Sequence, residues 1–249
     1  MQEIDASSIE EKREARAVFE LAYQNLIREN RFFTDNYFLD SLEYIFRKKT
    51  IIKKRDQLLY RARRFESENI DNKKLGEKFE GYDEEGSFVN KGNNWGSVGR
   101  MNPKGINVLY TSGDKRTCIL ELHPYYGEIY SVATIQVLND LKIADLSREY
   151  SVHKDSFEEE LSVLVQRNLS KGNGEEDYVF PQFVAAYCKK LGYDGIGYRS
   201  KYASKYDTQN GFGINYSIFN YDKCKAISSI LMKVREMNVD ISEYNMFKR

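Results

Sequence analysis

The sequence has little of what disulfide-rich domains and membrane proteins need. Its 249 residues include only three cysteines, Cys118, Cys188 and Cys224, which lie far apart and are odd in number. That pattern fits neither a disulfide framework nor a CxxC metal site, and it favours a reducing compartment. No run approaches the roughly 18 apolar residues that span a bilayer, and the opening MQEIDASSIEEKREAR is charged. We therefore expect a cytoplasmic protein without a membrane partner, and delivery into another cell without a signal peptide stays open.

An excess of charge of either sign is also missing. Lysine plus arginine total 38, and aspartate plus glutamate also total 38. Nucleic acid is therefore not an expected partner, and any phosphate group must be held by individually placed arginines. Aromatic residues make up 14% of the chain and hydrophobic residues 41%, in short runs. This composition is typical of a folded globular protein with a real hydrophobic core.

Two amphipathic helices are predicted in residues 1–55. Ser8 and Glu11 form a capping-box pattern, after which apolar residues recur at helical spacing as far as Leu26. A second helix opens at Thr34 and ends in a basic run that suits the negative end of a helix dipole. Residues 1–55 are thus expected to form a helical hairpin that precedes a catalytic domain at 56–249.

Short strands and further helices follow. LLYRARRF predicts a strand, and residues 66–99 predict a long loop or lid. INVLYTS predicts a buried strand, and TCILELH continues it as a second, strand-like element. Further strands are predicted at GEIYSVATIQV, DGIGYRS, NGFGINYSIF and KAISSILMKV, and helices from Ser156 to about Gly172 and from Pro181 to Gly192. The mixed order favours an α+β fold in which short strands surround a cleft and helices flank them.

Five residues at the ends of the predicted strands make up the candidate site: Arg61, Arg100, Tyr110, Glu121 and Ser200. Guanidinium groups bind phosphate in a bidentate way, so two arginines in one cleft can hold a pyrophosphate, although surface salt bridging is the ordinary role. Arg100 lies in GSVGRMNPKG, where glycines let the backbone approach a ligand closely. Neither GxGxxG nor GxxxxGK is present, so a nucleotide site would be of another type.

The other three residues have functional and structural interpretations that both stay open. Glu121 lies among apolar residues, where its charge can stabilise a cationic sugar centre or form an ordinary salt bridge. Tyr110 can stack on a planar ring or pack in the core. Ser200 can bond a carboxamide, orient the glutamate or form a turn. His123 and His153 lack any diagnostic spacing to a cysteine or serine, so a structural role is favoured for both.

Four segments, LLYRARRF, GRMNPKGINVLYTS, CILEL and GYDGIGYRS, occur in an order that resembles the RES domain over about residues 56–222. The family is named for its arginine, glutamate and serine. The resemblance implies a fold like that of ADP-ribosyltransferase toxins, and an enzyme that depletes NAD+ by phosphorolysis or hydrolysis of its nicotinamide–ribose bond. It puts the family's functional residues at Arg61, Arg100, Tyr110, Glu121 and Ser200, with NAD+ as substrate and with neither cofactor nor metal.

The sequence departs from the family pattern in three places. Met101 stands where an aromatic residue often follows the second arginine, and Trp95 lies upstream. The longer spacing between Arg63 and Arg100 predicts an inserted flap over the cleft. Typical toxins lack the hairpin at 1–55, which weakens the expectation of an Xre-type antitoxin, while another antitoxin or an immunity protein stays open. Besides NAD+ degradation, transfer of ADP-ribose to a protein and a non-catalytic NAD-binding module also stay open.

Overall fold

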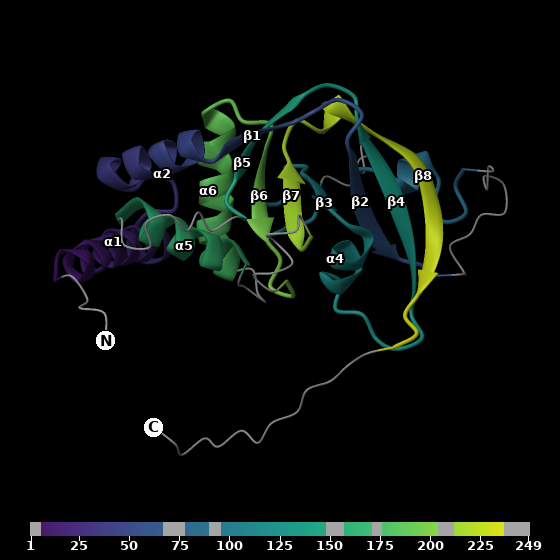
Figure 1. Cartoon of the computed structure of the whole chain (residues 1–249), viewed down its shortest axis with the longest axis horizontal. Helices are drawn as coiled ribbons and strands as arrows, with labels where there is room; N and C mark the ends of the chain where they lie inside the picture. The colour runs from purple at the N-terminus through teal and green to yellow at the C-terminus, as the bar shows by residue number, and fades with distance from the viewer. Residues whose placement is uncertain are drawn as a thin grey trace, which may run out of the picture.

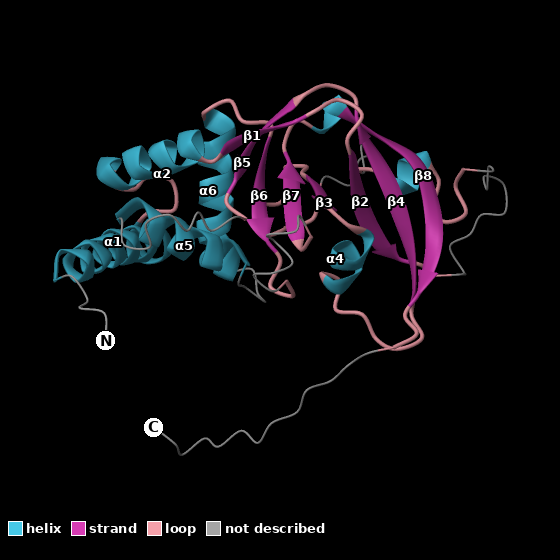
Figure 2. Ribbon diagram, in the orientation of Figure 1, coloured by secondary structure: helices cyan, strands magenta, loops and turns pink. Residues whose placement is uncertain are grey.

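In a computed structural model of the chain, the described residues are 6–66, 78–89, 96–147, 157–170, 176–203 and 212–236. They form one eight-stranded sheet with helices flanking it, so the predicted α+β fold class is confirmed (Figure 1). The helices α1, α2, α5 and α6 gather at one end of the molecule, and β2, β4 and β8 lie at the other (Figure 2). None of the described helices is long and apolar enough to cross a membrane.

The strands of the sheet lie in the order β1-β5-β6-β7-β3-β2-β4-β8. Their bounds are Thr50–Lys53 for β1, Leu58–Arg64 for β2, Leu109–Ser112 for β3, Ile129–Val137 for β4, Leu141–Asp145 for β5, Gly195–Arg199 for β6, Ile214–Ile218 for β7 and Cys224–Lys233 for β8. Strands β5 and β6 are parallel and the other neighbours antiparallel. Strands β2 and β3 pair only between Tyr60 and Ser112. The middle of the sheet is therefore weakly joined there.

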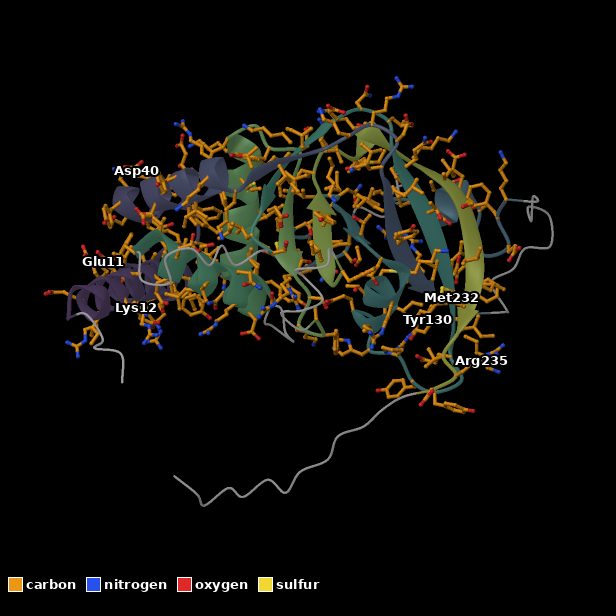
Figure 3. All side chains as sticks on the ribbon, viewed as in Figure 1. Glu11, Lys12, Asp40, Tyr130, Met232 and Arg235 are labelled. Carbon is orange, nitrogen blue, oxygen red and sulfur yellow. The ribbon has the colours of Figure 1, made fainter. Side chains whose placement is uncertain are left out.

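The predicted helical hairpin is present, although the last part of its range is a strand. The helices are α1 (Ala6–Gln24), which continues as a π-helical turn over Asn25–Glu29, and α2 (Asn36–Lys48). Ser8 lies inside α1 rather than before its first turn. Residues 50–53 form the edge strand β1 instead of helix, because their backbone pairs with β5. Glu11 and Asp40 lie on the exposed sides of the two helices (Figure 3).

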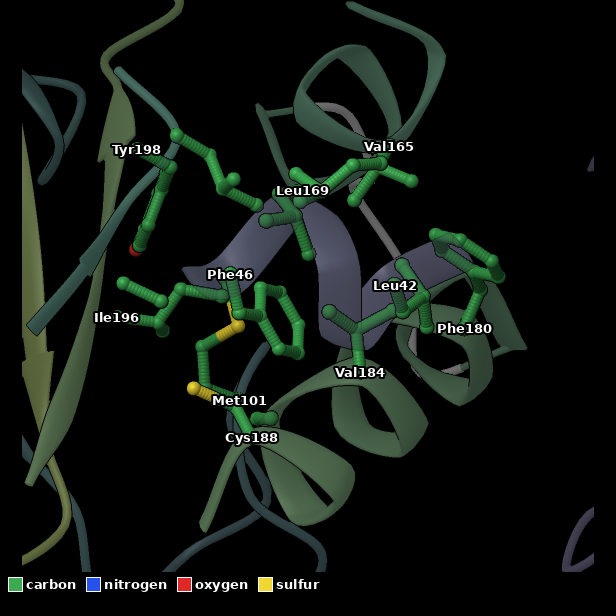
Figure 4. Close-up of a cluster of buried hydrophobic side chains, with 14 of the residues drawn as sticks. Leu42, Phe46, Met101, Val165, Leu169, Phe180, Val184, Cys188, Ile196 and Tyr198 are labelled. Atoms are coloured by element: carbon green, nitrogen blue, oxygen red, sulfur yellow. The ribbon is translucent and has the colours of Figure 1, made fainter. Parts of the chain in front are cut away.

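Helices α1 and α2 share a hydrophobic core with α5 (Phe157–Ser170), α6 (Val179–Lys190) and the neighbouring strands. Phe46 and Leu42 from α2 lie against Val184 and Phe180 from α6 (Figure 4). Burying such side chains contributes about 1.5–3 kcal/mol each. Two smaller clusters cover the rest of the sheet, one of them between β2, β4 and the short helix α4 (Lys115–Leu120).

The segment TCILELH is not a strand. Its first four residues belong to the helix α4 (Lys115–Leu120), and Glu121 is the C-cap residue of that helix. The helix forms because Asp114 caps it, accepting hydrogen bonds from Thr117 N at 2.8 Å and from Thr117 Oγ1 at 2.6 Å. The prediction of a strand-like element was therefore wrong, because the local cap outweighs the density of apolar residues.

The other predicted elements are present with small shifts. Helix α6 begins two residues before Pro181 and ends at Lys190, just before Gly192, whose φ of 78° suits glycine. Within the predicted loop 66–99, Asp83 caps a short helix, α3 (Glu84–Ser87). Residues 67–77 and 90–95, with part of the predicted flap and Trp95, lie outside the described residues. So do residues 148–156 and 171–175, with His153, Ser156 and Gly172.

Candidate active site

A cavity of about 460 Å³ opens where β2 and β3 part. Four of the five predicted site residues line it, namely Arg61, Arg100, Tyr110 and Glu121. The fifth, Ser200, reaches the cavity through its contact with Glu121. The structure therefore brings together residues that β2, β3, α4, β6 and the loop before β3 supply separately. The cavity contains several guanidinium groups and one carboxylate, a pattern that suits an anionic ligand carrying a cationic centre.

Glu121 is held on one carboxylate oxygen. Its Oε1 accepts a hydrogen bond from Ser200 Oγ at 2.5 Å and another from Asn215 Nδ2 at 2.8 Å. Both donors are buried, at 2% and 4% exposure. Because a donor that follows β6 and a donor on β7 meet the same oxygen, the plane of the carboxylate is fixed within the cavity.

Ser200 follows β6 and is itself fixed. Its N–H donates to Gly213 O at 2.8 Å, and its Oγ accepts from Tyr202 N at 3.2 Å while donating to Glu121. Of the roles considered from the sequence, these contacts favour orientation of the glutamate, and the backbone contact with Tyr202 also makes Ser200 part of a turn.

Arg61 carries the least satisfied polar group of the cavity. Its Nη1 is buried and has no hydrogen-bond partner among the residues that the structure describes. Burial, with a smaller contribution from the charge of Arg63, lowers the pKa of the Arg61 guanidinium to about 9, and Tyr110 partly offsets this. A buried charged donor without a partner is costly, so the group is suited to receive an anion.

Arg100 enters the cavity from the loop before β3. Its Nη1 donates to Leu169 O at 3.1 Å and to Ser170 O at 3.2 Å, both at the C-terminal end of α5. These contacts place the guanidinium at the negative end of a helix dipole. The neighbouring Gly99 lets the backbone approach the protein's own Tyr110, since an added Cβ would lie 2.5 Å from the tyrosine oxygen. The glycine thus serves loop packing, where the sequence suggested close approach to a ligand.

Tyr110 anchors this loop through its hydroxyl. The hydroxyl donates to Asn102 Oδ1 at 2.6 Å and accepts from Met101 N at 2.8 Å. Burial raises the pKa of Tyr110 well above its ordinary value, so the group is neutral and able to donate. Asn102 in turn donates to Ser97 O and Ile106 O. The loop that carries Arg100 is therefore cross-linked by a buried hydrogen-bond network.

The profile of the RES domain matches residues 58–240. The chain belongs to the RES domain family. A search of the curated proteins gave no match. Among solved structures, the chain is similar to one in the crystal structure of the M. tuberculosis MbcT–MbcA toxin–antitoxin complex, with a TM-score of 0.44 and 15% identity, covering 80% of this chain and 93% of that chain.

Helices α1 and α2 precede the part of the chain that matches the RES domain, although they share its core. All five predicted site residues lie inside the matched range. The predicted division into an extension and a catalytic domain stays a prediction.

Three further residues that line the cavity were not predicted from the sequence. Asn215 and Ser112 form a buried pair beside Glu121, and Tyr198 lies on the cavity wall from β6. Burial raises the pKa of Tyr198 to about 12. One signal was available for Asn215, because a polar residue in the apolar run GINYSIF requires a buried partner.

Of the two histidines considered from the sequence, only His123 lies among the described residues, and it does not join the cavity. His123 lies on an exposed turn with a φ of 52°, where its Nε2 is 2.9 Å from Lys201 Nζ. It is absent from the described cavity lining.

Proposed function

We propose that this RES domain chain is a toxin-like enzyme that cleaves the nicotinamide–ribose bond of NAD+ and so depletes it. One observation carries the proposal: the Glu121 carboxylate, fixed by Ser200 and Asn215, shares a cavity with the unpartnered Nη1 of Arg61. An anion-binding group and an oriented carboxylate are the two features that cleavage of a dinucleotide at a glycosidic bond requires.

NAD+ supplies an anion for the arginines. Its pyrophosphate would take the buried Arg61 donor, and Arg100 would face the same group from the opposite loop. The pyrophosphate would thereby satisfy the donor that costs free energy in the unliganded protein. The ring of Tyr110 would lie beside the nicotinamide, while its hydroxyl stays engaged with Asn102.

Glu121 would act on the charge that develops during cleavage. As the bond between the ribose C1 carbon and the nicotinamide nitrogen breaks, both electrons leave with neutral nicotinamide and the ribose carries an oxocarbenium-like positive charge. The fixed carboxylate stabilises this cation without reorganising. An oxygen of water or phosphate then bonds to the carbon. Water loses its proton to solvent and gives ADP-ribose, and phosphate gives ADP-ribose phosphorylated on that carbon.

The test is product analysis by mass spectrometry with and without phosphate. We expect nicotinamide together with ADP-ribose or its phosphorylated form, and a loss of at least about 100-fold in the Glu121→Gln variant. The matched control is His123→Gln, an exposed position outside the described cavity lining. Unchanged turnover in Glu121→Gln would overturn the mechanism.

Two further assays separate the alternative activities. Labelled NAD+ that marks a macromolecule in a lysate, with little free ADP-ribose, would indicate an ADP-ribosyltransferase. Heat of NAD+ binding without consumption would indicate a non-catalytic module. The family resemblance also leads us to propose that an antitoxin or immunity protein restrains the enzyme in the cytoplasm. Rescue of growth by a co-expressed neighbouring gene would test this partner.

A further inference from the structure

We infer that Asn215, held by Ser112, is a positioning residue that fixes the Glu121 carboxylate; the inference rests on the proposed function. Asn215 lies on β7 and is 4% exposed, and Ser112 lies opposite it on β3 and is 2% exposed. Neither residue stands among the five that the RES resemblance points to.

The hydrogen bonds run in one direction. Ser112 Oγ donates to Asn215 Oδ1 at 2.7 Å, and Asn215 Nδ2 donates to Glu121 Oε1 at 2.8 Å. An ionised carboxylate accepts only, so the side of Asn215 that faces Glu121 must be the NH2 group. The amide oxygen then points to Ser112, whose hydroxyl must donate. Every group in the chain from Ser112 to Glu121 is therefore satisfied in one orientation.

This arrangement supplements Ser200 rather than repeating it. Ser200 reaches Oε1 from the end of β6, whereas Asn215 reaches the same oxygen from β7. A carboxylate with a single donor can still turn about the bond to its neighbouring carbon. Two donors that approach Oε1 from separate parts of the fold remove that freedom. We expect the arrangement to act on kcat, because it orients a group that works in the transition state.

The register of the sheet explains why these residues meet. Ser112 pairs with Asn215 in the β3–β7 ladder, and Tyr60 on β2 pairs with Ser112 at the single point where β2 and β3 join. The pair therefore lies at the point from which the cavity opens. A buried asparagine that bonds across a strand pair keeps one orientation only while its serine partner remains.

The experiment compares three variants with wild type in the full chain. Asn215→Leu removes the donor at similar volume, Asn215→Asp puts a second carboxylate beside Glu121, and Ser112→Ala removes the group that orients the amide. We expect kcat to fall about 10- to 100-fold in Asn215→Leu and less in Ser112→Ala, with KM for NAD+ changing less than about threefold. In Asn215→Asp the acid limb of the pH–kcat profile should move to higher pH, because two adjacent carboxylates resist joint ionisation.

The matched control is Ser229→Ala. Ser229 is 1% exposed on β8, and its Oγ donates to Tyr82 O at 2.7 Å, away from the cavity lining. It should lose thermal stability like Ser112→Ala and keep full turnover. If Asn215→Leu does not fold, the other two variants decide the question.

A second readout does not depend on turnover. We would follow the side-chain carboxyl carbon of Glu121 by carbon-13 NMR over a pH titration in wild type, Ser112→Ala and Asn215→Leu. A changed titration in either variant supports the inference, and superimposable titrations with unchanged kcat overturn it. Wild-type protein that leaves NAD+ intact would overturn the proposed function alone, and the titration would still decide the role of Asn215.

Discussion

Ser200 Oγ donates to Glu121 Oε1 across 2.5 Å, although the two residues stand 79 positions apart in the chain. We expect Ser200→Ala to lower kcat for NAD+ cleavage roughly 10- to 100-fold, because it removes one charge-assisted hydrogen bond and leaves that of Asn215. Steady-state kinetics of nicotinamide release measure this effect. Ser41→Ala on helix α2, whose hydroxyl bonds Tyr37 O, is the control. A kcat equal to that of wild type would mean that Ser200 shapes only the turn.

The hydroxyl and the ring of Tyr110 have separable roles. Tyr110→Phe keeps the ring and leaves Asn102 Oδ1 and Met101 N–H without their partner. We expect KM for NAD+ to rise about tenfold and the melting temperature to fall, because a buried network loses about 1–3 kcal/mol. Tyr44→Phe, at a half-exposed position on α2, is the control. If Tyr110→Phe binds NAD+ as well as wild type does, only the ring contributes to binding. That outcome is the one that the stacking interpretation of Tyr110 predicts.

Much of the fold could be predicted from the sequence, because alternation and capping are local properties. The strand at residues 58–64 and the helix that ends just before Gly192 follow directly from such patterns. Helix α4 escaped prediction because six residues with dense apolar character resemble a strand, and only the contact of Asp114 with Thr117 decides otherwise. In elements this short, the local patterns that favour a helix and those that favour a strand differ little in strength.

The meeting of the site residues could not be predicted from residue patterns alone. Asn215 and Glu121 stand 94 positions apart and come together only because β7 pairs with β3 while α4 packs beside it. Strand order is set by long-range pairing that leaves no periodic signal. Residue chemistry at predicted strand ends and the family resemblance agreed on the five site positions, and the resemblance did not include the buried asparagine that holds one of them.

Arg61 is expected to favour binding at the expense of stability. In a Glu121→Gln background, which prevents turnover, Arg61→Met should weaken NAD+ binding by about 2 kcal/mol, roughly 30-fold. Without NAD+ it should raise the free energy of unfolding by about 1–4 kcal/mol, because a buried unpaired charge is removed. Calorimetry and urea unfolding measure the two effects, and Arg55→Met, at an exposed position, is the control.

The stability effect of Arg61 has a defined pH dependence. The folded-state pKa near 9 lies below the ordinary value of 12.5, so between these values the unfolded chain binds more protons. The cost of the charge is therefore complete below pH 9 and shrinks above it, and the advantage of Arg61→Met should shrink likewise. A variant less stable than wild type at pH 7 would contradict the view that this charge is unpaired.

The N-terminal helices are expected to unfold together with the RES domain. Phe38 on α2 is 0% exposed, and its ring centre lies 6.2 Å from that of Phe180 on α6. Phe38→Ala should lower the free energy of unfolding by about 3–5 kcal/mol, because it leaves a cavity in the shared core. Phe33→Ala is the control, since Phe33 is 73% exposed. Melting is followed by tyrosine fluorescence. A melting temperature of the RES domain that stays at the wild-type value in Phe38→Ala would instead indicate that α1 and α2 form a separable extension.

Asp194, immediately before β6, links three parts of the chain. Its carboxylate accepts from Lys142 N at 2.8 Å, Lys223 Nζ at 2.9 Å and Asn220 Nδ2 at 3.0 Å. Burial acts to raise the pKa of Asp194, but these donors together lower it below its ordinary value. Because the folded-state pKa is depressed, the stabilisation is complete above the unfolded pKa of about 3.9 and is lost as the pH falls through the folded value.

Asp194→Asn tests this linkage. At pH 7 we expect the variant to lose about 2–3 kcal/mol of unfolding free energy, since an amide replaces the charge that pairs with Lys223 and its NH2 group faces another donor. As the pH falls below the unfolded pKa of about 3.9, the difference between wild type and variant should shrink. Urea unfolding at pH 7 and at pH 3 measures both values, with Asp40→Asn on the exposed side of α2 as the control. A difference that stays constant between the two pH values would show that the ionised form of Asp194 is not what joins β5 to β6.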